Sequence, residues 1–146
     1  MRIGSILENQ NLEKRIAVTP ELVKKYNSIG FEVRLIENYG SHLGIKDQQF
    51  IDVGAKIIKD ETEILNSSEV IVQLGMLSND KISNMKENQT LIGVLDPYKN
   101  KEQLESLAKK KINFFSLELL PRITRAQSMD ILSSQANLAG YKAVIE

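Results

Sequence analysis

The stretch TPELVKKYNSIGFEVRLI, residues 19–36, contains a helix pattern followed directly by a strand pattern. The helix is predicted to begin at Thr19-Pro20-Glu21, which supplies an N-cap hydroxyl, a first-turn proline and a carboxylate that the helix dipole favours. Gly30 is a typical residue at the end of a helix. The apolar, β-rich run Phe31–Ile36 follows at once, so this stretch predicts a helix that leads into a buried strand.

The same alternation repeats at intervals of roughly 20 residues along the chain. The β-rich apolar runs are Ile3–Ile6, Phe31–Ile36, Ala55–Ile58, Val70–Leu74, Thr90–Leu95 and Ile112–Leu117. Further helices are predicted at Asp47 to about Val53, Asp60–Leu65, Asn79–Met85 and after an N-cap at Asn100. Because strands that alternate with helices pair in parallel through right-handed crossovers, we expect one α/β domain over residues 1–146. Its sheet is predicted to be doubly wound and mostly parallel, of the flavodoxin or Rossmann-like kind.

The composition excludes several classes of function. The 146 residues carry 19 Lys and Arg against 19 Asp and Glu, which argues against a dedicated nucleic-acid-binding protein. The absence of cysteine removes disulfides, thiolate metal sites and thiol nucleophiles, and the one histidine, His42, cannot build a histidine-rich metal site. No apolar run has the ~18–20 residues of a membrane span. We expect a cytoplasmic domain with no metal, no nucleic-acid partner and no membrane insertion of its own.

The glycines do not form a nucleotide-binding loop. They stand at positions 4, 30, 40, 44, 54, 75, 93 and 140. No two are separated by a single residue, so the chain lacks the GxGxxG dinucleotide fingerprint, and it also lacks a P-loop. An isolated doubly wound domain without these loops has no obvious cradle for a pyrophosphate.

The segment PRITRAQSMDILSS, residues 121–134, is unusually polar for the junction of a strand and a helix. A loop is expected over Glu118–Arg125, with helix from about Ala126. Gln127, Asp130 and Ser133 then lie on one helical face, because they are spaced by three residues. With the guanidinium of Arg122 before them, these groups offer both donors and acceptors to a planar amide ligand.

A structural interpretation of the same segment stays open. Thr124 and Gln127 fit a capping box, in which Gln127 only satisfies backbone donors. Asp130 and Ser133 would then be solvated. In either case we expect the apolar neighbours Met129, Ile131 and Leu132 to turn into the core. The apolar stripe of the last helix continues to Glu146, which suggests that the helix is part of a longer polypeptide.

Several stretches resemble the N-terminal domain shared by alanine dehydrogenases and the alpha subunit of proton-translocating NAD(P) transhydrogenase. They are Met1-Arg2-Ile3-Gly4, Arg15-Ile16-Ala17-Val18-Thr19-Pro20, Gly30-Phe31-Glu32-Val33, Gly54-Ala55 and the string PRITRAQSMDILSSQANLAGYKAV at 121–144. The likeness covers essentially the whole chain. It implies the first half of a two-part NAD(H)-binding unit, whose second half is a Rossmann domain that follows residue 146.

The resemblance also implies residue roles and partners. Gln127 and Ser133 would contact the dihydronicotinamide, while Arg122 and Asp130 would orient its carboxamide and ribose and help to dock the NADP(H)-binding component. The expected activity is direct hydride transfer between NAD(H) and NADP(H), coupled to proton translocation in the full complex. A homodimer held peripherally at the inner membrane through that complex is expected.

Departures from the family pattern separate its two branches. Alanine dehydrogenases carry a lysine and a histidine where this sequence has Gln73 and Asp96, so the amino-acid chemistry is expected to be lost. Arg15, which would face a substrate carboxylate in those enzymes, remains, although it could simply pair with Glu13. Asp96-Pro97 could equally form a turn. The alternatives are an amino-acid dehydrogenase of the alanine dehydrogenase kind or a non-catalytic binding module.

Overall fold

The structure, a computed structural model, describes residues 1–121 and 123–146. Its centre is a six-stranded sheet in the order β3-β2-β1-β4-β5-β6, in which every neighbouring pair is parallel. The strands are β1 (Arg2–Ser5), β2 (Glu32–Ile36), β3 (Lys56–Ile58), β4 (Val70–Val72), β5 (Thr90–Gly93) and β6 (Asn113–Ser116). The predicted doubly wound parallel sheet is therefore confirmed.

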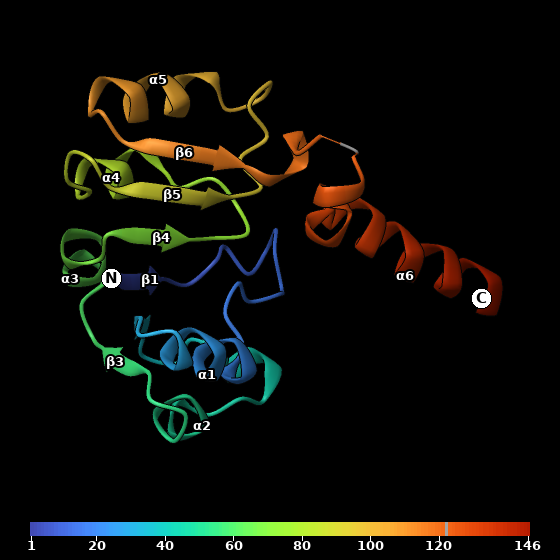
Figure 1. Cartoon of the computed structure of the whole chain (residues 1–146), viewed down its shortest axis with the longest axis horizontal. Coiled ribbons are helices and arrows are strands. Elements are labelled where there is room, and N and C mark those ends of the chain that lie inside the picture. Colours follow the sequence, from blue (N-terminus) through green and yellow to red (C-terminus); the bar gives the residue numbers. More distant parts are fainter. Residues whose placement is uncertain (122) are drawn as a thin grey trace.

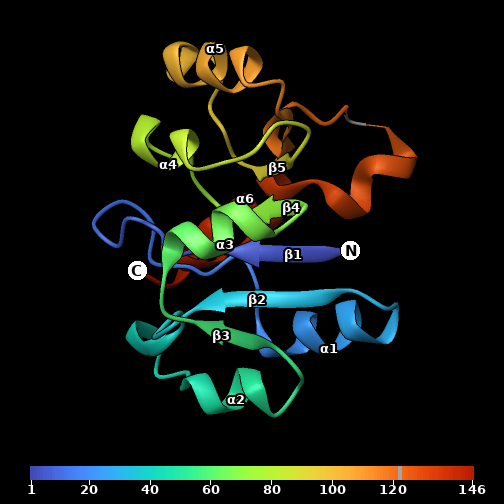
Figure 2. The same ribbon diagram turned by 90° about the vertical axis from the view of Figure 1, so that its left-hand side faces the viewer.

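Helices connect successive strands. They are α1 (Pro20–Ser28), α2 (Asp47–Ile51), α3 (Glu61–Ser67), α4 (Asn79–Ser83), α5 (Lys101–Lys109) and α6 (Ile131–Ile145), with 3₁₀ turns at Ser41–Leu43, Leu117–Leu119 and Thr124–Met129. The chain builds β1, β2 and β3 towards one side and then returns to add β4, β5 and β6 on the other (Figure 1, Figure 2). Right-handed crossovers then place α1 and α2 on one face of the sheet and α3, α4 and α5 on the opposite face.

Local sequence signals set most helix ends. Thr19 is the N-cap of α1, and its hydroxyl accepts a hydrogen bond of 3.3 Å from the Leu22 amide, as predicted. Gly30 follows the helix with a φ of 85°, a left-handed conformation that costs glycine little. The prediction that the Asn100 side chain caps α5 is wrong. Its Nδ2 instead donates to the Leu95 carbonyl at 2.8 Å, within the turn that precedes the helix.

The core lies between the sheet and its helices. Leu35 and Leu91 on the strands, Phe50 on α2 and Leu107 on α5 are all fully buried. Phe50 meets the buried ring of Tyr39 edge-on, with ring centroids 5.8 Å apart. Apolar burial of this kind is the main source of folding free energy, so these residues hold the connections of the sheet in place.

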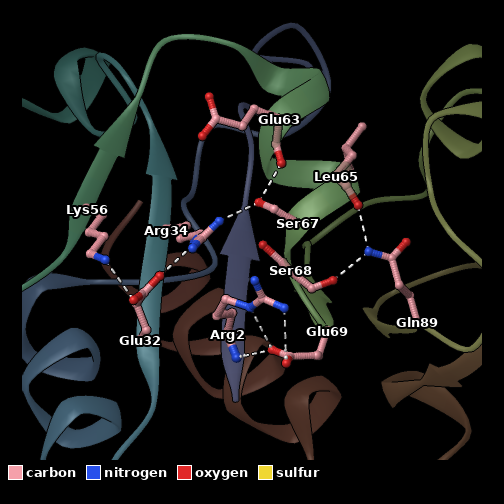
Figure 3. A network of polar contacts seen from close by, with 10 residues as sticks. All are labelled: Arg2, Glu32, Arg34, Lys56, Glu63, Leu65, Ser67, Ser68, Glu69 and Gln89. Carbon is pink, nitrogen blue, oxygen red and sulfur yellow. Dashed lines mark hydrogen bonds and ion pairs between the residues drawn. The ribbon is translucent and has the colours of Figure 1, made fainter.

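Polar side chains join neighbouring strands at the edge of the sheet where the strands begin, which we call the amino edge (Figure 3). The Glu32 carboxylate accepts from Arg34 Nε at 2.7 Å and from Lys56 Nζ at 2.8 Å. These hydrogen bonds, from Lys56 and then from Arg34, lower the pKa of Glu32 to about 2. Arg2 pairs with Glu69 in the same way across β1 and the start of β4.

Gln89 occupies a buried position at the amino edge (Figure 3). Its Nε2 donates to the carbonyls of Leu65, at 2.6 Å, and Ser68, while its Oε1 accepts from the Lys86 amide. The side chain thus satisfies three backbone groups that the surrounding turns leave unpaired. A buried amide with these partners stabilises the fold, since each group would otherwise be desolvated without compensation.

The segment after β6 departs from the prediction. Instead of one helix from about Ala126, the chain forms the 3₁₀ turn Thr124–Met129, becomes extended at Asp130 (φ −75°, ψ 95°) and only then enters α6. Met129 and Leu132 are 53% and 45% exposed, so the expectation that they turn into the core is wrong. They face an open cavity instead, and α6 runs away from the sheet (Figure 1).

The apolar side chains of α6 are also exposed, among them Leu138, Tyr141 and Val144. Over residues 1–121 and 123–146, no helix has the length and apolar character that crossing a membrane requires.

Candidate functional site

The sheet changes direction between β1 and β4, and their carboxyl ends meet at this switch point. Open α/β sheets bind ligands in the crevice outside the carboxyl ends of such strands. The arrows of β4, β5 and β6 point to the side of the molecule where the 3₁₀ turn at 124–129 and the start of α6 lie (Figure 1). This carboxyl edge therefore carries the candidate site.

A first cavity, of 360 Å³, lies within the segment after β6. It is lined by Leu120, Pro121, Ile123, Thr124, Ala126, Gln127, Asp130 and Ser133. The predicted site residues Gln127, Asp130 and Ser133 thus come together, but around a break in the helix rather than on one continuous helical face. Arg122, the fourth predicted residue, lies outside the described residues.

Asp130 is the N-cap of α6. Its Oδ1 accepts hydrogen bonds of 3.0 Å from the amides of Leu132 and Ser133, and the Ser133 hydroxyl donates to its Oδ2 at 2.7 Å. The alternative capping box of Thr124 and Gln127 is wrong, because the 3₁₀ turn begins after Ile123 and receives no side-chain cap. Asp130 and Ser133 therefore build a helix end and line the cavity at the same time.

A second cavity, of 580 Å³, lies between the carboxyl edge and the start of α6. It is lined by Arg15, Ile16, Leu74, Val94, Leu117, Ser128, Met129, Asp130, Ile131, Leu132, Ser134 and Gln135. Its walls are mainly apolar, and Asp130 lines both cavities. Sequence analysis missed this cavity, although Leu74, Val94 and Leu117 each follow the end of a strand, and that position was a usable signal.

Arg15 is the cationic residue on the wall of the second cavity, but it is already paired. Its Nε donates to Glu13 Oε1 at 2.8 Å and its Nη2 to Glu13 Oε2 at 2.6 Å. The hydrogen bond from Arg15 lowers the pKa of Glu13. The predicted alternative, in which Arg15 pairs with Glu13, is confirmed, and the guanidinium faces the cavity with much of its charge compensated.

Gln73 lies beneath the switch point and is buried. Its Oε1 accepts from the Ser5 hydroxyl and from the Ile6 amide, both at 2.9 Å. The Ser5 Oγ lies 2.7 Å from the hydroxyl of Tyr39, whose pKa is raised by burial. Gln73 therefore joins the ends of β1 and β4 within a buried polar network, as a neutral side chain.

Asp96 follows β5 in a left-handed conformation, with a φ of 42°. Its carbonyl accepts from the amides of Lys99 and Asn100, so the predicted turn is confirmed. Its carboxylate pairs with Lys99 Nζ at 2.8 Å, and its amide donates to Glu118 Oε1. The other carboxylate oxygen of Glu118 is buried and has no hydrogen-bond partner among the described residues.

The structure offers little to a metal ion. No group of three or more acidic or histidine side chains with the arrangement of a metal site occurs within residues 1–121 and 123–146. His42 is exposed, and its Nε2 lies 2.8 Å from the Lys14 carbonyl.

Comparison with known proteins agrees with this architecture. Residues 4–139 match the family described as alanine dehydrogenase/PNT, N-terminal domain. The chain is also similar to the first of the chains that make up NAD(P) transhydrogenase subunit alpha in two bacteria. It is 38% identical over 150 residues to that of Rickettsia prowazekii and 40% identical over 151 residues to that of Rhodospirillum rubrum. The whole chain is aligned in both cases, and it spans 39% of the length of each relative.

Two further relatives define the range of the family. The crystal structure of transhydrogenase from Sinorhizobium meliloti superposes with a TM-score of 0.92 and 39% identity, covering 99% of this chain and 43% of that one. An alanine dehydrogenase of Methanococcus maripaludis is 26% identical over 99% of this chain and 38% of its own length. The parallel sheet, its carboxyl-edge cavities and these similarities lead to one conclusion: the chain belongs to the alanine dehydrogenase/PNT N-terminal domain family.

Proposed function

We propose that the chain is the N-terminal domain of the NAD(H)-binding alpha subunit of an NAD(P) transhydrogenase. Its task is to position the nicotinamide for direct hydride transfer between NAD(H) and NADP(H), which the full complex couples to proton translocation. One observation carries the proposal: the first cavity gathers Gln127, Asp130 and Ser133 in a chain similar over its whole length to transhydrogenase alpha subunits.

The donor set of the first cavity fits a carboxamide. A planar amide presents two N–H donors and one carbonyl acceptor. The side-chain amide of Gln127 complements it in both directions, the Ser133 hydroxyl can donate or accept, and the Asp130 carboxylate accepts. A nicotinamide bound there supplies the C4 atom that gives or accepts the hydride.

The second cavity gives the neighbouring surface that such a reaction needs. Leu74, Val94 and Met129 line it with apolar atoms, and they can exclude water from a ring held next to Asp130. Hydride transfer between two nicotinamides needs no general acid or base, only close and aligned reacting carbons. The carboxyl edge agrees with this, because Gln73 is buried and neutral and Asp96 is paired with Lys99.

The second candidate function is an amino-acid dehydrogenase. It is favoured by the position of Arg15 on the wall of the second cavity, where a substrate carboxylate could approach. Two features disfavour it. The bidentate pairing with Glu13 already occupies the guanidinium, and Gln73 has no charge with which to polarise a carbonyl group.

The proposal includes partners outside this chain. A following Rossmann domain would hold the pyrophosphate, for which these residues have no glycine-rich loop. That domain agrees with the 39% of the relatives' length that the chain spans. An NADP(H)-binding component would dock at the same edge. A homodimer on the cytoplasmic side of the inner membrane would complete the assembly.

The change Gln127→Asn in the full-length protein tests the proposal, since it keeps the amide but shortens its reach by one methylene. We expect hydride transfer to slow by roughly tenfold to a hundredfold, because misplacing the ring by about 1 Å is enough for such a loss. NADH affinity should change little, as most of it would come from the Rossmann domain. Stopped-flow transfer rates, NADH titration and a thermal melt measure the three quantities.

The matched control is Gln48→Asn, which makes the same chemical change on α2, on an exposed side chain that bonds only Asp52. Its transfer rate should equal that of the unmodified protein. A normal transfer rate in Gln127→Asn would contradict the role of Gln127. Reduction of pyruvate with ammonia and NADH by the unmodified protein would instead establish the amino-acid dehydrogenase.

A further inference from the structure

Glu8 bridges the two loops that leave the switch point of the sheet. It lies three residues beyond the end of β1. Its Oε1 accepts from the Leu74 amide at 2.5 Å and its Oε2 from the Gly75 amide at 3.3 Å, just beyond β4. One carboxylate thus receives two successive backbone donors from the opposite loop.

The two bridged loops form opposite parts of the wall of the second cavity. The loop between β1 and α1 contributes Arg15 and Ile16, and the loop after β4 contributes Leu74. A change in the distance between the loops would therefore change the width of this cavity. The Glu8 carboxylate holds that distance at the outer part of the loops, while the Ile6 amide and Gln73 join the strand ends beneath it.

Other contacts fix the loop between β1 and α1 on its opposite side. The Tyr39 hydroxyl accepts from the amides of Ala17 and Val18 at 3.1 Å, and the Lys14 carbonyl lies 2.8 Å from His42 Nε2. Both partners belong to the chain that follows β2. The loop is thus anchored on the β2 side by Tyr39 and His42 and on the β4 side by Glu8.

The surroundings of Glu8 do not favour its charge. Burial raises its pKa, and the two backbone donors only partly offset that effect. Glu13 also raises it, while Lys81 on α4 lowers it but is itself paired with Glu61 at 3.0 Å. The remaining groups that interact electrostatically with Glu8 are Arg15, already paired with Glu13, and the buried Tyr39.

This environment argues against a purely stabilising role. A carboxyl group with a raised pKa in the folded state makes the protein most stable at low pH, and that stability is lost as the pH rises from the unfolded pKa through the folded one. At neutral pH the fold therefore retains the Glu8 charge at a cost. A neutral glutamine would keep one acceptor for the two amides without that cost.

We propose that Glu8 is a positioning residue that fastens the two loops lining the second cavity, and that the cavity opens when Glu8 takes up a proton. A protonated carboxyl group keeps one good acceptor oxygen, so one of the two amides loses its partner and the loop after β4 is released. The proposal concerns the shape of the cavity and holds whatever the cavity binds.

The experiment is an NMR titration between neutral and acidic pH, with ¹⁵N amides and ¹³C-methyl methionines in the 146-residue chain. Leu74 and Gly75 report the bridge, Met129 reports the cavity wall, and the buried core residue Met85 is the internal control. We expect the two amides and the Met129 methyl to follow one titration at a higher pH than that of the exposed Glu105. The Met85 methyl should not move.

Two variants complete the test. In Glu8→Gln the common titration of the amides and of Met129 should disappear, with a melting temperature at neutral pH equal to or above that of the unmodified chain. Glu105→Gln should leave the titration intact. The proposal is overturned if Met129 does not move with the amides, if the titration persists in Glu8→Gln, or if that variant unfolds. None of these outcomes bears on the transfer rate of Gln127→Asn, so the two proposals fail separately.

Discussion

The two edges of the sheet treat their polar side chains differently. At the amino edge Glu32, Glu69 and Gln89 find partners on neighbouring strands and turns (Figure 3). At the carboxyl edge Glu8 is half-buried at a cost and one oxygen of Glu118 is buried without a described partner. The difference indicates that the amino edge is built for stability, whereas the carboxyl edge keeps unused polar capacity beside its cavities.

The largest effect on stability is expected at the amino edge. Gln89→Leu should lower the free energy of unfolding by about 3 kcal/mol, because three backbone groups each lose a buried partner. Denaturant unfolding measures the loss, and Gln48→Leu on exposed α2 is the control, expected within about 0.5 kcal/mol. If the comparison holds, NADH affinity of the folded full-length variant is unchanged. A loss of affinity would show that the amino edge also shapes the site.

A smaller loss is expected from the buried network beneath the carboxyl edge. Tyr39→Phe removes the hydroxyl that accepts from Ala17 and Val18 and should cost about 2 kcal/mol. Unlike Gln89→Leu, it should also shift the Arg15 side-chain resonances, since the loop that carries Arg15 loses an anchor. Tyr98→Phe, at a side chain 89% exposed, should change neither quantity. Unaltered Arg15 resonances in Tyr39→Phe would break the distinction between the edges.

The smallest effect concerns the pH dependence of the amino edge. The folded pKa of Glu32, about 2, is below its unfolded value, so its ion pairs stabilise the fold above pH ~4.3 and this stability is lost as the pH falls towards 2. Because the side chain is partly exposed, we expect only about 0.5–1 kcal/mol. Glu32→Gln should flatten the acid limb of the stability curve by this amount, and high salt should do the same to the unmodified chain. An unchanged acid limb would contradict the assignment.

Much of the fold could be predicted from local patterns. Each expected β-rich run contains most of an observed strand, and Thr19 and Gly30 bound α1 as predicted. These signals are local, because a cap or an alternation of apolar residues acts within one element. Asn100 shows the limit: the side chain of a typical N-cap residue bonds instead to the Leu95 carbonyl in the turn before it.

The candidate site was predicted only in part. Gln127, Asp130 and Ser133 were grouped correctly, but by a helical face that does not exist. Periodicity could not reveal that the helix breaks at Asp130, although aspartate is itself a preferred N-cap residue. The second cavity depends on Arg15, Leu74 and Met129, which come from segments far apart in sequence. Their proximity follows from strand order, which no single segment encodes.

The placement of Asp130 has a consequence for how this protein can evolve. The same carboxylate begins α6 and lines both cavities. A substitution there changes helix formation and ligand contact in one event, so natural selection cannot tune one property without altering the other. Positions such as Met129 and Gln135, which line a cavity without capping a helix, are left as the places where specificity can drift by single steps.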